Sequence, residues 1–181
     1  MSKGAMPESA HLAPETARLA RVRLAGESLT RLSPILEADR AQAVADLAAE
    51  NRFAPVHPKP DVVFAPGPYA LTLSVQEGRL VFDIRTAAKE EGGAEEAVVA
   101  HHLALGPFRG LIKDYQMLVD SHIMAVAEGR EQRVQAIDMG RRGLHNEGAE
   151  LLQGRLEDKI AIDFETARRL FTLVCVLHQR I

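Results

Sequence analysis

The amino-acid sequence predicts a single α+β domain, in which an antiparallel sheet of three or four strands packs against a helical carboxyl-terminal half. Residues 69–85 alternate apolar with polar side chains on both sides of a Gln-Glu-Gly turn, which is typical of a β-hairpin. From residue 106 onward, apolar residues recur at intervals of three and four, which indicates amphipathic helices. Strands followed by helices are the pattern of the α+β class, and we expect the hairpin at the centre of the sheet.

The composition is that of one soluble globular domain. The chain has 181 residues, of which 46% are hydrophobic and 26% are charged. Residues 1–14 show no periodicity and are predicted to form a disordered lead-in to a domain at residues 15–181. A formal net charge of −3 gives no general attraction to polyanions, which argues against nucleic acid as a partner.

The sequence also predicts a cytoplasmic protein that does not enter a membrane. No segment reaches the roughly 20 apolar residues that a membrane-spanning helix needs, and the amino terminus lacks the apolar run of a signal peptide. The single cysteine, Cys175, lies in an apolar run and is predicted to be a buried core residue.

The first third of the chain predicts a strand, a helix and a loop. Residues 19–24 alternate imperfectly and are expected to form a first strand. Ser33 is a suitable cap and Pro34 suits the first helical position, so a helix should run from there to about Glu50. Residues 53–68 contain five prolines, each of which lacks a backbone donor, so this segment is predicted to be a loop.

The hairpin is followed by a third strand and two strong helices. A charged loop at residues 89–96 leads to an apolar run at residues 97–105, the expected third strand. The next helix should begin near Pro107 and end near Gly129. The last helix is capped by Asp163 and is apolar enough to be the central core helix. The inward stripe of the first of these helices is predicted to be Phe108, Leu111, Ile112, Tyr115, Leu118, Val119, Ile123 and Val126.

Residues 130–158, between those two helices, admit two interpretations. The apolar residues keep helical spacing through the glycines, so one continuous or lightly kinked helix would place Arg141 in the apolar stripe. A guanidinium there needs a partner, and Asp138, a carboxylate from elsewhere, or a bound anion would supply it. Alternatively the chain breaks at Gly140 to Gly143, and a second helix begins near Asn146. Such a break would present backbone N–H groups beside two arginines, which is an anion-binding arrangement.

The predicted site is therefore centred on this glycine-rich segment. Arginine recognises phosphate and carboxylate groups in a bidentate way, so Arg141 and Arg142 are the residues expected to hold an anionic group. The predicted ligand-binding residues are Arg141, Arg142, His145, Asn146 and Glu147, supported by Lys113, Asp114 and Tyr115 from the preceding helix.

Other chemistry finds no support in the sequence. Adjacent His101 and His102 would face opposite sides of a strand, and no metal-binding or nucleotide-binding motif occurs, so neither a metal nor a cofactor is predicted. The turn at Gly140 to Gly143 also suggests the Gly-x-x-Gly loop of KH domains, but the apolar residue expected after it is replaced by Asn146.

Several long strings resemble a known family. The segments "GRLVFDIR", "FRGLIKDY" and "IDMGRRGLHNEGAELL", together with "FAPV" and "FETARRLFTLVCVLH", are similar to the uncharacterised bacterial protein family number 0262 of the UPF series. The resemblance runs from about Leu19 to His178. It implies small soluble bacterial proteins with no assigned activity, so no catalytic residue follows from it.

These observations favour a non-catalytic cytoplasmic binding or regulatory protein that recognises an anionic group on a small ligand or a partner protein. One alternative is an enzyme for a phosphorylated or carboxylated metabolite, with Glu147 or His145 as the acid-base group. The other is an RNA-binding module that uses the glycine turn. The sequence leaves the oligomeric state open.

Overall fold

The structure is a computed structural model that describes residues 13–25 and 32–178. Most of the predicted lead-in, residues 1–12, lies outside the described residues. The elements in chain order are β1 (Leu19–Leu24), α1 (Pro34–Ala49), β2 (Phe53–Pro55), β3 (Tyr69–Gln76), β4 (Arg79–Thr86), β5 (Ala97–Ala104), the 3₁₀ turn η2 (Gly106–Phe108), α2 (Arg109–Ala127), α3 (Glu131–Leu156), β6 (Ile160–Ile162) and α4 (Phe164–Leu177). The predicted α+β class is confirmed.

The main sheet has four strands in the order β1-β3-β4-β5, so the predicted hairpin of β3 and β4 lies at its centre. The hairpin pair β3–β4 and the pair β4–β5 are antiparallel, but β1 pairs with β3 in parallel. The sheet is therefore mixed, because α1 and the proline-rich segment carry the chain back to the start of the sheet before β3 begins. A separate two-stranded sheet joins β2 to β6 and gives part of the proline-rich segment a regular structure.

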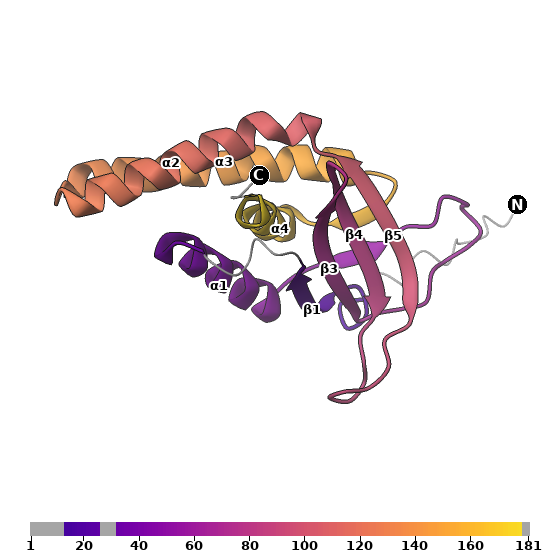
Figure 1. The fold of residues 1–181 in the computed structure, drawn as a ribbon. Helices are drawn as coiled ribbons and strands as arrows, with labels where there is room; N and C mark the ends of the chain where they lie inside the picture. Colours follow the sequence, from indigo (N-terminus) through magenta and orange to yellow (C-terminus); the bar gives the residue numbers. More distant parts are fainter. Residues whose placement is uncertain (1–12, 26–31, 179–181) are drawn as a thin grey trace, which may run out of the picture.

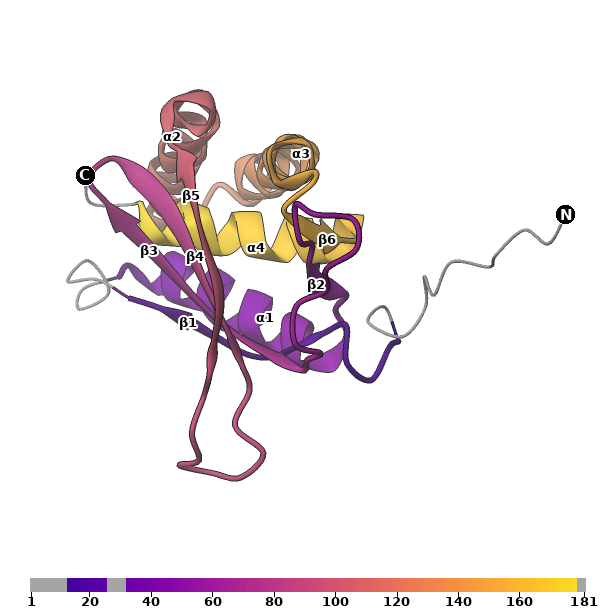
Figure 2. The same ribbon diagram turned by 90° about the vertical axis from the view of Figure 1, so that its right-hand side faces the viewer.

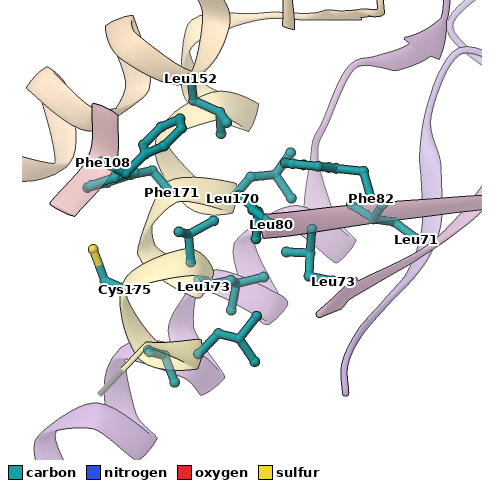
Figure 3. Close-up of a cluster of buried hydrophobic side chains, with 14 of the residues drawn as sticks. Leu71, Leu73, Leu80, Phe82, Phe108, Leu152, Leu170, Phe171, Leu173 and Cys175 are labelled. Atoms are coloured by element: carbon teal, nitrogen blue, oxygen red, sulfur yellow. The ribbon is translucent and has the colours of Figure 1, made fainter. Parts of the chain in front are cut away.

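Helix α4 is the central core helix, as predicted. It lies between α1 on one side and the pair α2 and α3 on the other, while β3 also contacts it (Figure 1; Figure 2). Asp163 caps it by accepting a hydrogen bond from the backbone N–H of Thr166 at 3.0 Å. Figure 3 shows how Leu170, Phe171 and Leu173 pack between the sheet and the helices. Cys175 is fully buried there, as predicted.

Helices α2 and α3 form a long antiparallel hairpin that crosses over α4. In Figure 1 this hairpin extends to the left, well beyond α4. The part nearest the sheet is buried against the rest of the protein, whereas the distal part is covered on fewer sides. This difference determines which side chains of the hairpin remain exposed.

Candidate functional site

Helix α3 is continuous from Glu131 to Leu156, so the interpretation as one helix is confirmed and no helix begins at Asn146. Tertiary packing outweighs the weak helix propensity of the glycines. Gly148 lies directly against the ring of Phe171, where a larger residue would not fit, whereas a side chain at Gly140 would make only ordinary contact with Leu118 of α2. The backbone N–H groups of this segment are therefore used within the helix, and they do not form an anion-binding helix start.

Arg141 is held by two carboxylates from different helices. Its Nη1 lies 3.3 Å from Asp39 Oδ2 of α1, and its Nη2 lies 3.3 Å from Asp138 Oδ1, one turn back on α3. The side chains of Arg141 and Asp39 are 17% and 14% exposed, so this ion pair is largely shielded from solvent. The expectation that a guanidinium in this stripe needs a partner is confirmed. Asp138 and a carboxylate from another helix, Asp39, both fill this role.

Two aromatic rings complete this polar cluster. The Tyr115 hydroxyl of α2 donates a hydrogen bond to Asp39, and the ring of His145 lies 5.4 Å from the Tyr115 ring, centroid to centroid. His122 Nε2 also lies 3.6 Å from Asp138 Oδ1. We call the residues Asp39, Tyr115, His122, Asp138, Arg141 and His145 the polar cluster. It ties α1, α2 and α3 together.

Burial and charge keep His145 and Tyr115 neutral near pH 7. Burial, followed by the positive charges of Arg141, Arg168 and Arg169, lowers the pKa of His145 to about 4. Burial and the negative charge of Asp39 raise the pKa of Tyr115. Neither group is suited to proton transfer near neutral pH, because efficient acid-base catalysis needs a pKa close to the working pH.

The other five predicted site residues lie elsewhere. Arg142, Asn146 and Glu147 are exposed on α3, and Lys113 and Asp114 are exposed on α2. The structure thus brings Tyr115, Arg141 and His145 together and leaves the remaining five on the surface.

The sequence did not predict Asp39 or His122 as residues of this cluster. It also did not predict that Asp138 lies beside His122. A signal for Asp39 was present in α1, where Leu36, Ala43 and Leu47 are buried. Asp39 follows Leu36 by three residues and precedes Ala43 by four, so it occupies a position on the same stripe. An acidic residue on a buried stripe predicts a partner from another element, although the stripe alone does not identify Arg141.

The low pKa of His145 makes a prediction about stability and pH. Because the folded-state pKa lies below the ordinary value, the unfolded state binds this proton more readily, and stability is lost as the pH falls from about 6.5 toward 4. Between about pH 7 and pH 5, we expect the free energy of unfolding to fall by about 2 kcal/mol more in wild type than in His145→Phe, which keeps an aromatic ring beside Tyr115. Urea unfolding at both pH values measures this difference. An unchanged pH dependence in His145→Phe would contradict the assignment.

The distal part of the hairpin carries a second notable surface. The predicted inward stripe of α2 is buried at Ile112, Tyr115 and Val119, but Ile123 and Val126 on the same stripe are 45% and 57% exposed. The prediction that these two residues are inward was wrong, because the hairpin at that point extends beyond α4 (Figure 1). We call residues 120–138 the hairpin end.

Exposed apolar side chains concentrate on this hairpin. Among the described residues, the exposed large hydrophobic side chains on α2 and α3 are Met117, Ile123, Met124, Val126 and Met139. An open hollow of about 410 Å³ lies at the hairpin end, with Val126 and Val134 in its lining beside Arg130 and Glu131. The apolar side chains that line this hollow, with charged residues at its rim, mark an interaction site more often than scattered apolar residues do.

The described residues contain neither a candidate metal site nor a candidate membrane-spanning helix. In residues 13–25 and 32–178, no group of three or more His, Cys, Asp or Glu side chains is arranged to hold a metal ion. Over the same ranges, no helix combines the length and the apolar character needed to cross a membrane.

Together these features define an α+β protein with a partly buried polar cluster and a projecting helical hairpin. Residues 16–180 match the model of a family described as "Uncharacterised protein family (UPF0262)", and the chain belongs to this family. No solved structure matches the chain.

Relatives from three bacteria cover nearly the whole chain, and all are named UPF0262 proteins. One from Granulibacter bethesdensis is 66% identical over 91% of each chain. Another, from Acidiphilium cryptum, is 59% identical over 90% of this chain and 93% of its own. A third, from Azorhizobium caulinodans, is 47% identical over 91% of this chain and 96% of its own. The predicted family resemblance is confirmed.

Proposed function

We propose that this protein is a non-catalytic binding protein that holds an amphipathic, acidic helix of a partner protein against the hairpin end. The observation that supports this proposal is the uncovered continuation of the core-facing stripe of α2. Ile112, Tyr115 and Val119 are covered by the protein itself, whereas Ile123 and Val126 have the same orientation and no such cover. An apolar stripe at helical spacing is the surface on which another amphipathic helix packs.

The neighbouring packing favours a helix as the occupant. Helix α4 crosses the hairpin beside this surface and packs on the same side of it (Figure 1; Figure 2). A partner helix that lay next to α4 would extend an interface that the protein already uses internally. Val134 of α3 and the hollow beside it give the apolar surface a second wall.

Arg142 supplies the predicted recognition of an anionic group. Val134, Asp138, Arg142 and Asn146 follow one another at intervals of four residues, so they form one row along α3. Asp138 is already bound to Arg141, whereas Arg142 is exposed and has no ion pair within the described part of the chain. A carboxylate on a partner helix would pair with Arg142, while Asn146 provides a hydrogen-bonding group one turn further along.

In this proposal the polar cluster has a supporting role. Arg141 and Tyr115 both bind Asp39, so the cluster fixes the middle of the hairpin to α1. A fixed hairpin loses less conformational freedom on binding than a mobile one. The two adjacent arginines therefore have different roles, with Arg141 inside the protein and Arg142 toward the partner.

A display library of amphipathic helical peptides tests this proposal. We expect the full chain to enrich peptides with one apolar face and a carboxylate beside it. Selection with Arg142→Glu should enrich peptides with lysine or arginine at that position, because the charge on the protein is reversed. Glu147→Arg, a charge reversal outside the row, is the matched control and should leave the preference for acidic peptides intact. The same acidic preference in wild type and Arg142→Glu would contradict the proposal.

A further inference from the structure

We propose that the free edge of β5 pairs with β5 of a second copy of this chain, in antiparallel orientation, to form a dimer with a continuous sheet. This inference is independent of the proposed function, because it concerns the opposite end of the fold from the hairpin end. It begins with the position of β5, which is the last strand in the order β1-β3-β4-β5. One side of β5 pairs with β4, and the other side has no strand next to it in the described sheet.

Apart from one irregularity at its amino-terminal end, the edge of β5 lacks the features that usually prevent pairing. Its eight residues, Ala97–Ala104, include no proline and no Lys, Arg, Asp or Glu. Its register shift lies at its amino-terminal end, next to Arg85 of β4, so the rest of the strand is regular. Edge strands in proteins that stay monomeric are generally short, bulged, covered or charged. An exposed, regular and uncharged edge is a surface for strand addition.

The other edge of the sheet shows the contrast. Strand β1 carries Arg21 and Arg23, which both form ion pairs with Glu95 from the loop between β4 and β5. The nearer pair, Arg23 Nη2 to Glu95 Oε1, is 2.7 Å long. Charged side chains at an edge oppose the approach of another strand. Of the two edges of the main sheet, β5 is therefore the one open to a partner.

The charges at the two ends of β5 identify a second copy as the partner. Glu96 directly precedes the strand and Arg109 begins the helix that follows it; both are exposed and have no ion pair within the described ranges. In an antiparallel pair, Glu96 of one copy lies near Arg109 of the other, and the same contact occurs at both ends. A parallel pair would instead place like charges together.

The register follows from the faces of the strand. Val99, His101 and Leu103 pair with Ile84, Phe82 and Leu80 of β4, which are fully buried, so these three face the core. A twofold axis at His101 places Val99 opposite Leu103 of the second copy and keeps all core-facing residues on one side. Ala100 then lies on the outer face opposite His102 of the second copy.

Sedimentation velocity of the full chain over a range of concentrations tests this inference. We expect wild type to dimerise and Ala100→Lys to weaken the dimer about tenfold or more, because each added ammonium group would lie opposite His102 of the other copy and diagonal to that copy's own added ammonium group. Ala100 is paired with Asp83 of β4, so the ammonium has a partner within its own chain and the fold should be kept. The matched control is Ala20→Lys, the same change at an exposed position of β1, which should leave the dimer unchanged.

A charge exchange gives a second readout that does not depend on the first. Glu96→Arg and Arg109→Glu should each weaken the dimer alone, because like charges then meet at both ends. A mixture of the two variants should restore association, since each end again joins opposite charges. A wild type that is monomeric throughout, or an Ala100→Lys variant as dimeric as wild type, would overturn the inference. So would dissociation by Val126→Lys, which would place the contact between copies at the hairpin end.

Discussion

Gly148→Ala is expected to destabilise the protein by about 3 kcal/mol, toward the upper end of the range for overpacked cores. A methyl group at this position of α3 would overlap the ring of Phe171, which is fully buried in α4. The ring is fully buried beside Phe108 and Leu170, so it can move away only by displacing these neighbours (Figure 3). The gain in helix propensity, about 1 kcal/mol, is too small to compensate.

The matched control for this substitution is Gly143→Ala in the same helix. Gly143 is exposed and has open space where a methyl group would be, so the substitution should stabilise the protein by about 1 kcal/mol. Urea unfolding followed by circular dichroism measures both changes. Opposite signs would confirm that α3 is continuous at Gly143 and closely packed at Gly148, whereas stabilisation by Gly148→Ala would contradict that packing.

Asp39→Ala is expected to cost about 3 kcal/mol of unfolding free energy. The substitution leaves the Tyr115 hydroxyl without its acceptor and leaves Arg141, which is 17% exposed, with Asp138 alone. The cost lies at the lower end of the range for broken buried ion pairs because the second carboxylate remains. Glu37→Ala is the control on the same helix. Its side chain is 50% exposed, and it should change stability by less than about 0.5 kcal/mol.

A double-mutant cycle with Arg141→Met separates the ion pair from general damage. If Asp39 and Arg141 stabilise the protein through each other, Arg141→Met should cost less in the Asp39→Ala background than in wild type. Equal costs in the two backgrounds would show that the residues act independently, and the role of the cluster in fixing the hairpin would then be excluded.

The sequence predicted local structure well because local structure depends on neighbours in the chain. The hairpin of β3 and β4, the start of α1 at Pro34 and the cap at Asp163 were all predicted from signals within a few residues. The continuity of α3 could not be decided in this way. The glycines favour a break locally, whereas the packing of α3 on α2 and α4, including the close approach of Gly148 to Phe171, comes from other helices and outweighs this tendency.

The candidate site was predicted only in part, for the same physical reason. Arg141 was recognised as a residue that needs a partner, but Asp39 lies 102 residues away in the sequence, and helical periodicity does not pair distant segments. The exposure of Ile123 and Val126 was missed because a stripe of apolar residues has the same spacing whether or not another helix covers it. The extent of that cover depends on where the hairpin crosses α4, which is a property of the tertiary fold.

The binding of a selected acidic helical peptide to Val126→Lys, compared with Val63→Lys, tests the proposed function most directly. These valines are 57% and 63% exposed, so the two substitutions are alike except in their place on the molecule. Calorimetric titration should show binding at least about tenfold weaker for Val126→Lys, because a buried valine contact is lost, and unchanged binding for Val63→Lys. Equal affinities of the two variants for the peptide would contradict binding at the hairpin end.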